Sequence, residues 1–281
     1  MPGDCLVCKL QWTAQSQNPS SAGNVQRPKQ TEAAVRIARK RLKAMTAQSN
    51  TTTTSSRHAS PHLGFVALAY VVLKIASVFP VSAFGSKPPW FPALSAPVPE
   101  VVAYFSTHAL PVLVCAFLQV GAAIPFGIFA ASAASRLHFL GANAAGTYIA
   151  LFGGVMAAIN EFSSGAIISV MAQPLVGQEA ALLHGLHYLS VMFGGPGFTM
   201  PFGLMMAGVS VVAGFMKLLP KWVVVLGVLL AVVGELSWLS MMLPKANFLI
   251  PLARWPGFVW LIATGFKLPK NVSRDATVAF A

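Results

Sequence analysis

Five ionisable side chains lie inside apolar stretches of this sequence, where a charge is costly. They are Lys74, Glu161, His184, His187 and Glu235. Ionisable groups in membrane helices usually face the interior of the helix bundle or water, so each of them is a candidate functional residue. Among them, Lys74, Glu161 and Glu235 are the candidates for a substrate or ion pathway.

A metal site is one chemistry that these residues could support. His184 and His187 are three residues apart and would share one face of a helix. Two neutral imidazoles and an ionised carboxylate, from Glu161 or Glu235, are ligands that zinc accepts. Two alternatives stay open: histidines at the outer membrane interface that bind water or carbonyl groups, and a proton relay. Apart from such a metal, the sequence indicates no cofactor.

An ion pair is a second hypothesis. Glu235 could pair with Lys74, because both fall in the central to outer parts of helices that start on the same side of the membrane. The alternative is a protonated Glu235 that is hydrogen-bonded to a neighbouring helix, since burial favours the neutral carboxyl group. The sequence contains no P-loop, GxSxG or HExxH motif, so we predict no catalytic residues and favour a non-enzymatic protein.

The elements that position these residues are six apolar stretches of spanning length, separated by short polar turns. The chain of 281 residues is 56% hydrophobic and 9% charged, whereas soluble domains carry about 25% charged residues. In lipid the backbone must satisfy its own hydrogen bonds, so stretches of this kind form helices. The predicted fold is therefore all-α, a polytopic integral membrane helix bundle over residues 61–270. The predicted helices are 63–85, 108–132, 143–172, 179–216, 222–243 and 250–267.

A helix break is predicted at Gly194, Gly195, Pro196 and Gly197, inside the fourth apolar stretch. A continuous helix over 179–216 would be about 57 Å long, against a hydrocarbon core of about 30 Å. The four residues therefore indicate a joint between two helical pieces. The third stretch is also long, so its end and the first piece of the fourth are expected to pair as an outer helical hairpin.

Two further sequence features bear on the fold. The sequence Pro-Phe-Gly occurs at 125–127 and again at 201–203, in helices that run in the same direction, which could reflect a parallel internal repeat. The link after the first helix is rich in proline and carries Trp90 and Phe91. It is expected to be an ordered or interfacial loop with aromatic anchoring.

The ends of the chain are predicted to be tails. Residues 1–60 are rich in Ser, Thr, Gln and Asn and are expected to be a disordered basic cytoplasmic tail. A possible amphipathic helix at 31–46 has bases on one face, which suits anionic lipid headgroups. A solvated charge run and an organellar transit peptide are the alternatives. Residues 271–281 form a short cytoplasmic C-terminal tail.

Positive charge predicts the orientation. The formal net charge is +12, but only 7 acidic residues are present, so missing acids explain much of it and nucleic acid is not an expected partner. The loops on the side of the N-terminal tail contain most of the bases: Arg136, Lys217, Lys221, Lys267, Lys270 and Arg274. The loops on the other side contain only Lys87, Lys245 and Arg254, so both termini are expected in the cytoplasm. The expected partner is the lipid bilayer; the sequence identifies no protein partner.

The last third of the chain resembles a family of bacterial multi-pass membrane proteins known as a domain of unknown function. The features that carry the resemblance are Leu-Pro-Lys-Trp at 219–222 and Trp-Pro-Gly-Phe-x-Trp-Leu-Ile at 255–262. The resemblance implies a bundle of six or seven helices in the bacterial cytoplasmic membrane and assigns no site residues. The favoured function is structural, sensory or accessory. A small-solute or ion carrier and a metal-dependent intramembrane enzyme are the alternatives.

Overall fold

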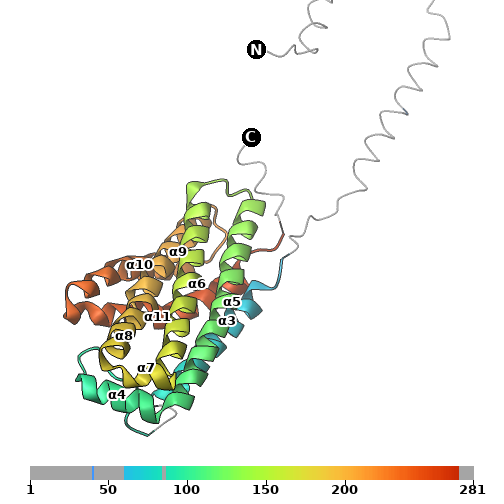
Figure 1. The fold of residues 1–281 in the computed structure, drawn as a ribbon. Helices are drawn as coiled ribbons and strands as arrows, with labels where there is room; N and C mark the ends of the chain where they lie inside the picture. Colours follow the sequence, from blue (N-terminus) through green and yellow to red (C-terminus); the bar gives the residue numbers. More distant parts are fainter. Residues whose placement is uncertain (1–39, 41–59, 84–86, 272–281) are drawn as a thin grey trace, which may run out of the picture. The chain divides into compact units, whose positions relative to one another are not determined.

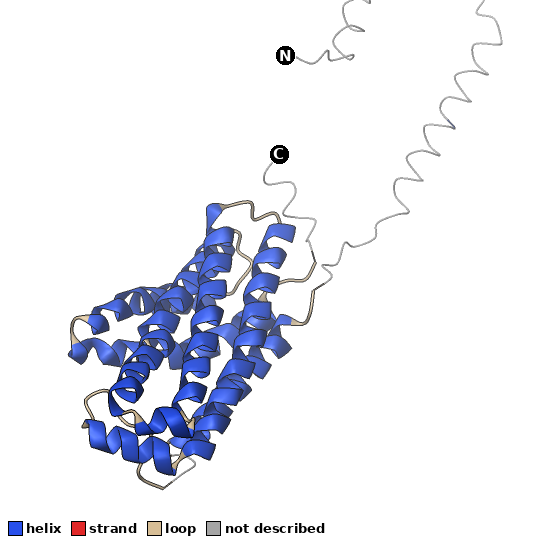
Figure 2. Ribbon diagram, in the orientation of Figure 1, coloured by secondary structure: helices blue, strands red, loops and turns tan. Residues whose placement is uncertain are grey.

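The computed structural model describes residues 40, 60–83 and 87–271. The predictions for the two tails and for the amphipathic helix at 31–46 therefore lie almost entirely outside the described residues. Within the described part every regular element is a helix, which confirms the predicted all-α fold (Figure 2). In chain order the elements are α3 (Leu63–Val78), η1 (Phe79–Val81), α4 (Val98–Thr107), α5 (Ala109–Phe139), α6 (Ala145–Met171), α7 (Pro174–Gln178), α8 (Ala180–Gly194), α9 (Pro196–Phe215), α10 (Lys221–Leu236), η2 (Ser237–Met241), η3 (Pro244–Phe248) and α11 (Leu249–Lys267) (Figure 1).

In the described chain, six helical segments are long and apolar enough to cross a membrane. Each overlaps one of the predicted helices, which confirms the membrane class of the fold. The second segment, however, continues past the predicted end at 132 to Phe139. Arg136 therefore belongs to a helix and not to a loop. It is fully buried, and its guanidinium donates to the Ser60 hydroxyl at 2.7 Å and to the Leu268 carbonyl at 3.3 Å.

The link between the first two spans is not only a loop, because it contains α4. This helix has proline in its first turn and Glu100 near its N-terminus, two features that favour helix initiation. It packs at one end of the bundle against α5, α7 and α8, and we call the group of buried residues there, which also includes residues of α6, the terminal cluster. These are Val81, Val101, Tyr104, Phe105, Val112, Cys115, Ala116, Ile168, Met171, Ala172 and Leu183.

The chain breaks where the sequence predicts. α8 ends at Gly194 and α9 begins at Pro196, and Gly195 between them has φ −90° and ψ −107°, outside the helical region. The side chain of Asn160 on α6 donates a hydrogen bond to the Gly197 carbonyl, which ties the joint to its neighbour. The predicted hairpin is also present, since α6 and α8 lie in contact on either side of α7.

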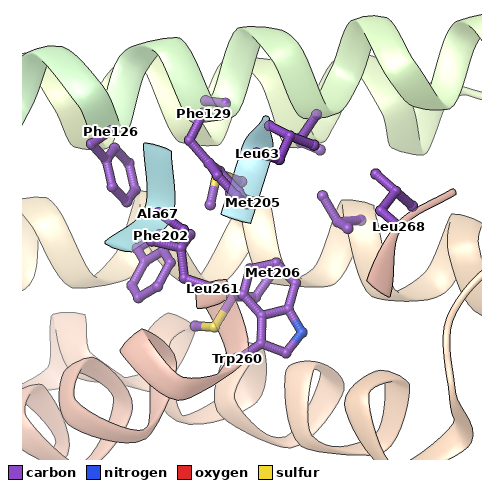
Figure 3. Packing of buried hydrophobic residues seen from close by; sticks show 14 of the residues in the cluster. Leu63, Ala67, Phe126, Phe129, Phe202, Met205, Met206, Trp260, Leu261 and Leu268 are labelled. Atoms are coloured by element: carbon purple, nitrogen blue, oxygen red, sulfur yellow. The ribbon is translucent and has the colours of Figure 1, made fainter. Parts of the chain in front are cut away.

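A larger group of buried apolar residues, the core cluster, fills the space between α3, α5, α6, α9, α10 and α11. The two Pro-Phe-Gly sequences meet here, with the ring centroids of Phe126 and Phe202 5.5 Å apart. Pro125 and Pro201 are accommodated inside α5 and α9 without ending them. The residues of the core cluster labelled in Figure 3 are Leu63, Ala67, Phe126, Phe129, Phe202, Met205, Met206, Trp260, Leu261 and Leu268.

Small residues bring α6 and α9 into close contact. A Cβ atom at Gly208 would lie 2.7 Å from the Ala150 backbone nitrogen, and one at Gly153 would lie 2.6 Å from the Pro201 carbonyl oxygen. Both distances are too short for a side chain, so only glycine allows this approach. Close backbone contact of this kind is how helices associate in lipid, where burying apolar side chains gains little.

Candidate functional site

A cavity of about 540 Å³ lies between the core cluster and the terminal cluster. Its wall is formed by α3, α5, α6, α8 and α11 with the loop that carries Trp90 and Phe91. The broken helix contributes directly, because Gly194 and Gly195 are part of the wall. Most of the wall is apolar, and its polar side chains include Lys74, Ser82, Cys115, Gln119, Ser164, Ser190, Asn247 and Arg254.

A buried ion pair lies beside this cavity. Lys74 on α3 lines the cavity, and its ammonium group donates to Oε1 of Glu161 on α6. Glu161 is fully buried and Lys74 is 4% exposed. Glu161 Oε2 is buried without a hydrogen-bond partner among the described residues, so the carboxylate has room for a further donor.

The predicted pairing of Lys74 with Glu235 is therefore wrong. α3 packs against α5 and α11, whereas α10, which carries Glu235, packs mainly against α9 and α11. Similar depth along the bundle made the two residues plausible partners, but they lie on helices that are not neighbours. Glu235 is half-buried, and one of its carboxylate oxygens is buried without a hydrogen-bond partner in the described structure.

Arg254 is a functional candidate that sequence reasoning missed. It lies in the first turns of α11, and its Nη2 donates to the Gly194 carbonyl at the end of α8. Its guanidinium also lies over the ring of Phe198, 4.5 Å from the centroid. Counting Arg254 as a base of the outer loops concealed this role. Its position inside an apolar stretch was the signal that could have identified it.

The two histidines do not join Glu161 in a metal site. His187 is fully buried and packs against Phe105 of the terminal cluster and against Phe91, which borders that cluster. The ring centroids are 5.5 Å apart for Phe91 and 6.2 Å apart for Phe105. His184 packs against Tyr188, with centroids 5.0 Å apart. No group of three His, Cys, Asp or Glu side chains in the described residues is placed to hold a metal ion. The Glu161 carboxylate points instead to Lys74 on α3.

Several polar side chains complete this level of the bundle. Gln119 donates to the Glu161 backbone carbonyl at 3.5 Å, and Ser164 donates to the Ser190 carbonyl at 2.9 Å. Together with the charged groups they separate the two apolar clusters along α5 and α6. We call this set the polar layer: Lys74, Gln119, Glu161, Ser164, Ser190 and Arg254.

No known protein family, curated protein or solved structure matches this chain. The resemblance of the last third to a family of membrane proteins stays a prediction. Function is therefore inferred from the cavity and the polar layer.

Proposed function

We propose that this chain is a membrane carrier that binds a small solute in the cavity beside the polar layer. One observation carries the proposal: a cavity of about 540 Å³ is lined by Lys74, which forms a buried ion pair with Glu161. Pockets of about 300–1,000 Å³ with apolar walls and few polar groups are typical of small-molecule sites. Ionisable groups inside a membrane bundle commonly mark the path of a substrate or ion.

The joint at Gly195 supports movement as well as binding. Carriers often place discontinuous helices beside the substrate site, where the ends of the half-helices bind the substrate while one part of the bundle moves against the other. Here the break between α8 and α9 forms part of the cavity wall, and the Arg254 side chain holds the last carbonyl of α8. A solute that contacts Arg254 would therefore act directly on the joint.

A second candidate function is sensory, as the sequence favours. The same contact between Arg254 and Gly194 would couple binding in the cavity to the position of α8 without transport. Uptake of the bound solute into proteoliposomes distinguishes the two functions. A carrier moves the solute across the membrane, whereas a sensor binds it and leaves it on one side.

For location, we propose a bacterial cytoplasmic membrane with both termini in the cytoplasm. The distribution of bases supports this orientation: Lys217, Lys221 and Lys267 are at the ends of helices on the proposed inner side, and Lys87 and Lys245 are on the outer side. The cavity then lies toward the outer face, because it is lined by residues near the C-terminal end of α3.

Cys115 offers a direct test of access to the cavity. The chain has three cysteines, so the Cys5→Ser/Cys8→Ser variant leaves Cys115, a residue of the cavity wall, as the single thiol. Cys115 is only 5% exposed and also belongs to the terminal cluster, but it lines the cavity, so we expect a membrane-impermeant thiol reagent that enters the cavity to label it from the outer side. The control is Ala133→Cys on the same helix, in a background without other cysteines, because Ala133 is 1% exposed in the core cluster.

The control variant should stay unlabelled until the protein is denatured. Equal protection of Cys115 and the control thiol, in membranes of either orientation, would contradict a cavity that water and solutes reach. The same result would also contradict the sensory function, since a sensor and a carrier both require that the solute reaches this cavity.

A further inference from the structure

We infer that the solute is a small organic anion with an apolar body, bound through the guanidinium of Arg254. This inference rests on the proposed function, since it names the chemical class that the same cavity would accept. It starts from the charges of the cavity wall. Two cationic groups, Lys74 and Arg254, line the cavity, and one carboxylate, that of Glu161, lies behind Lys74.

The two cations differ in how they are compensated. Lys74 is paired with Glu161, whereas Arg254 has no carboxylate partner among the described residues and binds a backbone carbonyl and an aromatic ring. In a region of low dielectric constant an uncompensated charge is expensive, and an opposite charge brought next to it is strongly attracted. The cavity therefore carries one positive charge in excess, which favours an anion over a neutral or cationic solute.

The hydrogen-bond capacity of Arg254 also favours an anionic solute. A guanidinium has five N–H donors in a rigid plane. One bond, from Nη2 to the Gly194 carbonyl, holds the side chain in place, and Nε is buried without a partner in the described structure. The remaining donors can take a carboxylate, sulfonate or phosphate group in two parallel hydrogen bonds, a geometry that arginine provides and lysine does not.

The rest of the wall defines the body of the solute. Trp90, Phe91, Trp255 and Phe258 contribute aromatic surface, and aliphatic side chains such as that of Ile250 fill the spaces between them. A single inorganic ion would leave most of about 540 Å³ unfilled and would gain nothing from these rings. An aromatic or branched aliphatic acid matches both the charged and the apolar parts of the wall.

The charge preference can be measured at Cys115 with two methanethiosulfonate reagents of similar size. One carries an ethylsulfonate group and the other an ethyltrimethylammonium group, and each rate is divided by the rate for a free thiol in solution. We expect the anionic reagent to be favoured at Cys115, and Arg254→Gln to lower this preference by about tenfold. Because the measurement is a ratio, the reactivity of the thiol itself cancels.

Two variants keep the result interpretable. Arg254→Lys retains the charge and should retain most of the preference, even if it weakens binding of a planar acid. Lys245→Gln removes an exposed charge outside the cavity wall and should leave the ratio unchanged. An equal effect of Lys245→Gln would mean that general surface charge, and not Arg254, sets the preference.

Protection of Cys115 by a solute completes the test. The probes are phenylacetate, phenylacetamide and phenethylammonium, which share a ring and differ in charge. Phenylacetate should slow labelling in the parent protein and lose this effect in Arg254→Gln. Labelling without anion preference, or stronger protection by the amide or the ammonium compound, would overturn the anion class while leaving the proposed function intact. A Cys115 that neither reagent labels would overturn both.

Discussion

The core cluster and the polar layer share α3, α5, α6 and α11, yet different forces hold them together. In the core cluster, glycines let α6 and α9 touch along their backbones, and aromatic rings such as Phe126 and Phe202 interlock. In the polar layer a few turns away, the helices are joined by an ion pair and by side chains that bind carbonyl groups. The polar layer borders the cavity of about 540 Å³ and supplies most of the charged and polar side chains of its wall.

This difference shows how one bundle separates stability from function. Close packing excludes a solute, so a binding cavity requires a level at which the helices stay apart. At that level stability depends on polar contacts. Removing one partner of a buried ion pair lowers stability more than removing an apolar contact, because the other partner stays buried with an uncompensated charge. Substitutions in the two regions should therefore differ in how much they lower the free energy of unfolding and in whether their effects add in double variants.

The largest effect is expected from Lys74→Met, which leaves the Glu161 carboxylate buried without its cation. Removing one partner of a buried ion pair costs about 3–5 kcal/mol. The double variant Lys74→Met/Glu161→Met removes both charges and should recover most of the loss. Thermal unfolding in detergent, followed by fluorescence-detected size exclusion, measures both variants beside the parent protein. A double variant no better than the single one would show that Glu161 gains nothing from Lys74.

The second-largest effect is expected from Gly208→Ala, which tests the close packing of α6 on α9 in the core cluster. Gly208→Ala places a methyl group 2.7 Å from the Ala150 backbone nitrogen, and this backbone cannot move aside as a side chain could. Overpacking of this kind costs about 1–3 kcal/mol. Gly121→Ala is the matched control, because a Cβ atom there meets nothing within 4 Å. The melting temperature in detergent should fall for Gly208→Ala and stay within error for Gly121→Ala. Equal stability of the two would refute close packing of α6 on α9.

The spans and the joint could be predicted from the sequence because they depend on local properties. A stretch of apolar residues must be helical in lipid, and glycines with a proline at 194–197 cannot continue a helix that is already too long. The partner of Lys74 could not be predicted in this way. Depth along the membrane follows from position in the chain, but the lateral order of helices follows from packing, so the sequence favoured Glu235 and did not predict the pairing with Glu161.

Arg254 and α4 illustrate two other limits. Arg254 was counted as a loop base, because a charge near the end of an apolar stretch can belong either to the turn or to the helix. Its partner, the Gly194 carbonyl, is 60 residues away in the chain and comes near only in the folded bundle. α4 is short and lies in a proline-rich link, where the prolines suggested a loop although one of them begins the helix.

A smaller effect is expected where the two regions meet. Asn160→Ala removes the hydrogen bond to the Gly197 carbonyl and should cost about 1 kcal/mol. The control is Ser169→Ala on the same helix, whose hydroxyl binds the carbonyl of Ala166 three residues earlier and does not touch the joint. The melting temperature in detergent should fall for Asn160→Ala and stay within error for Ser169→Ala. No change in either variant would mean that the glycines and proline alone fix the joint.

The smallest effect is expected for His187→Phe, which separates packing from imidazole chemistry. His187 packs against Phe91 and Phe105 beside the terminal cluster, so a phenyl ring should replace it with a loss of stability below about 1 kcal/mol. His187→Ala leaves a cavity and should be clearly less stable, by about 1–3 kcal/mol. Melting temperature and labelling of Cys115 measure stability and the cavity separately. If His187→Phe destabilised the protein as much as His187→Ala, the ring nitrogens of His187 would have to form hydrogen bonds that stabilise the fold. The polar layer, which already reaches α8 at Ser190, would then include His187 and extend toward Phe91 and Phe105 in the direction of α4.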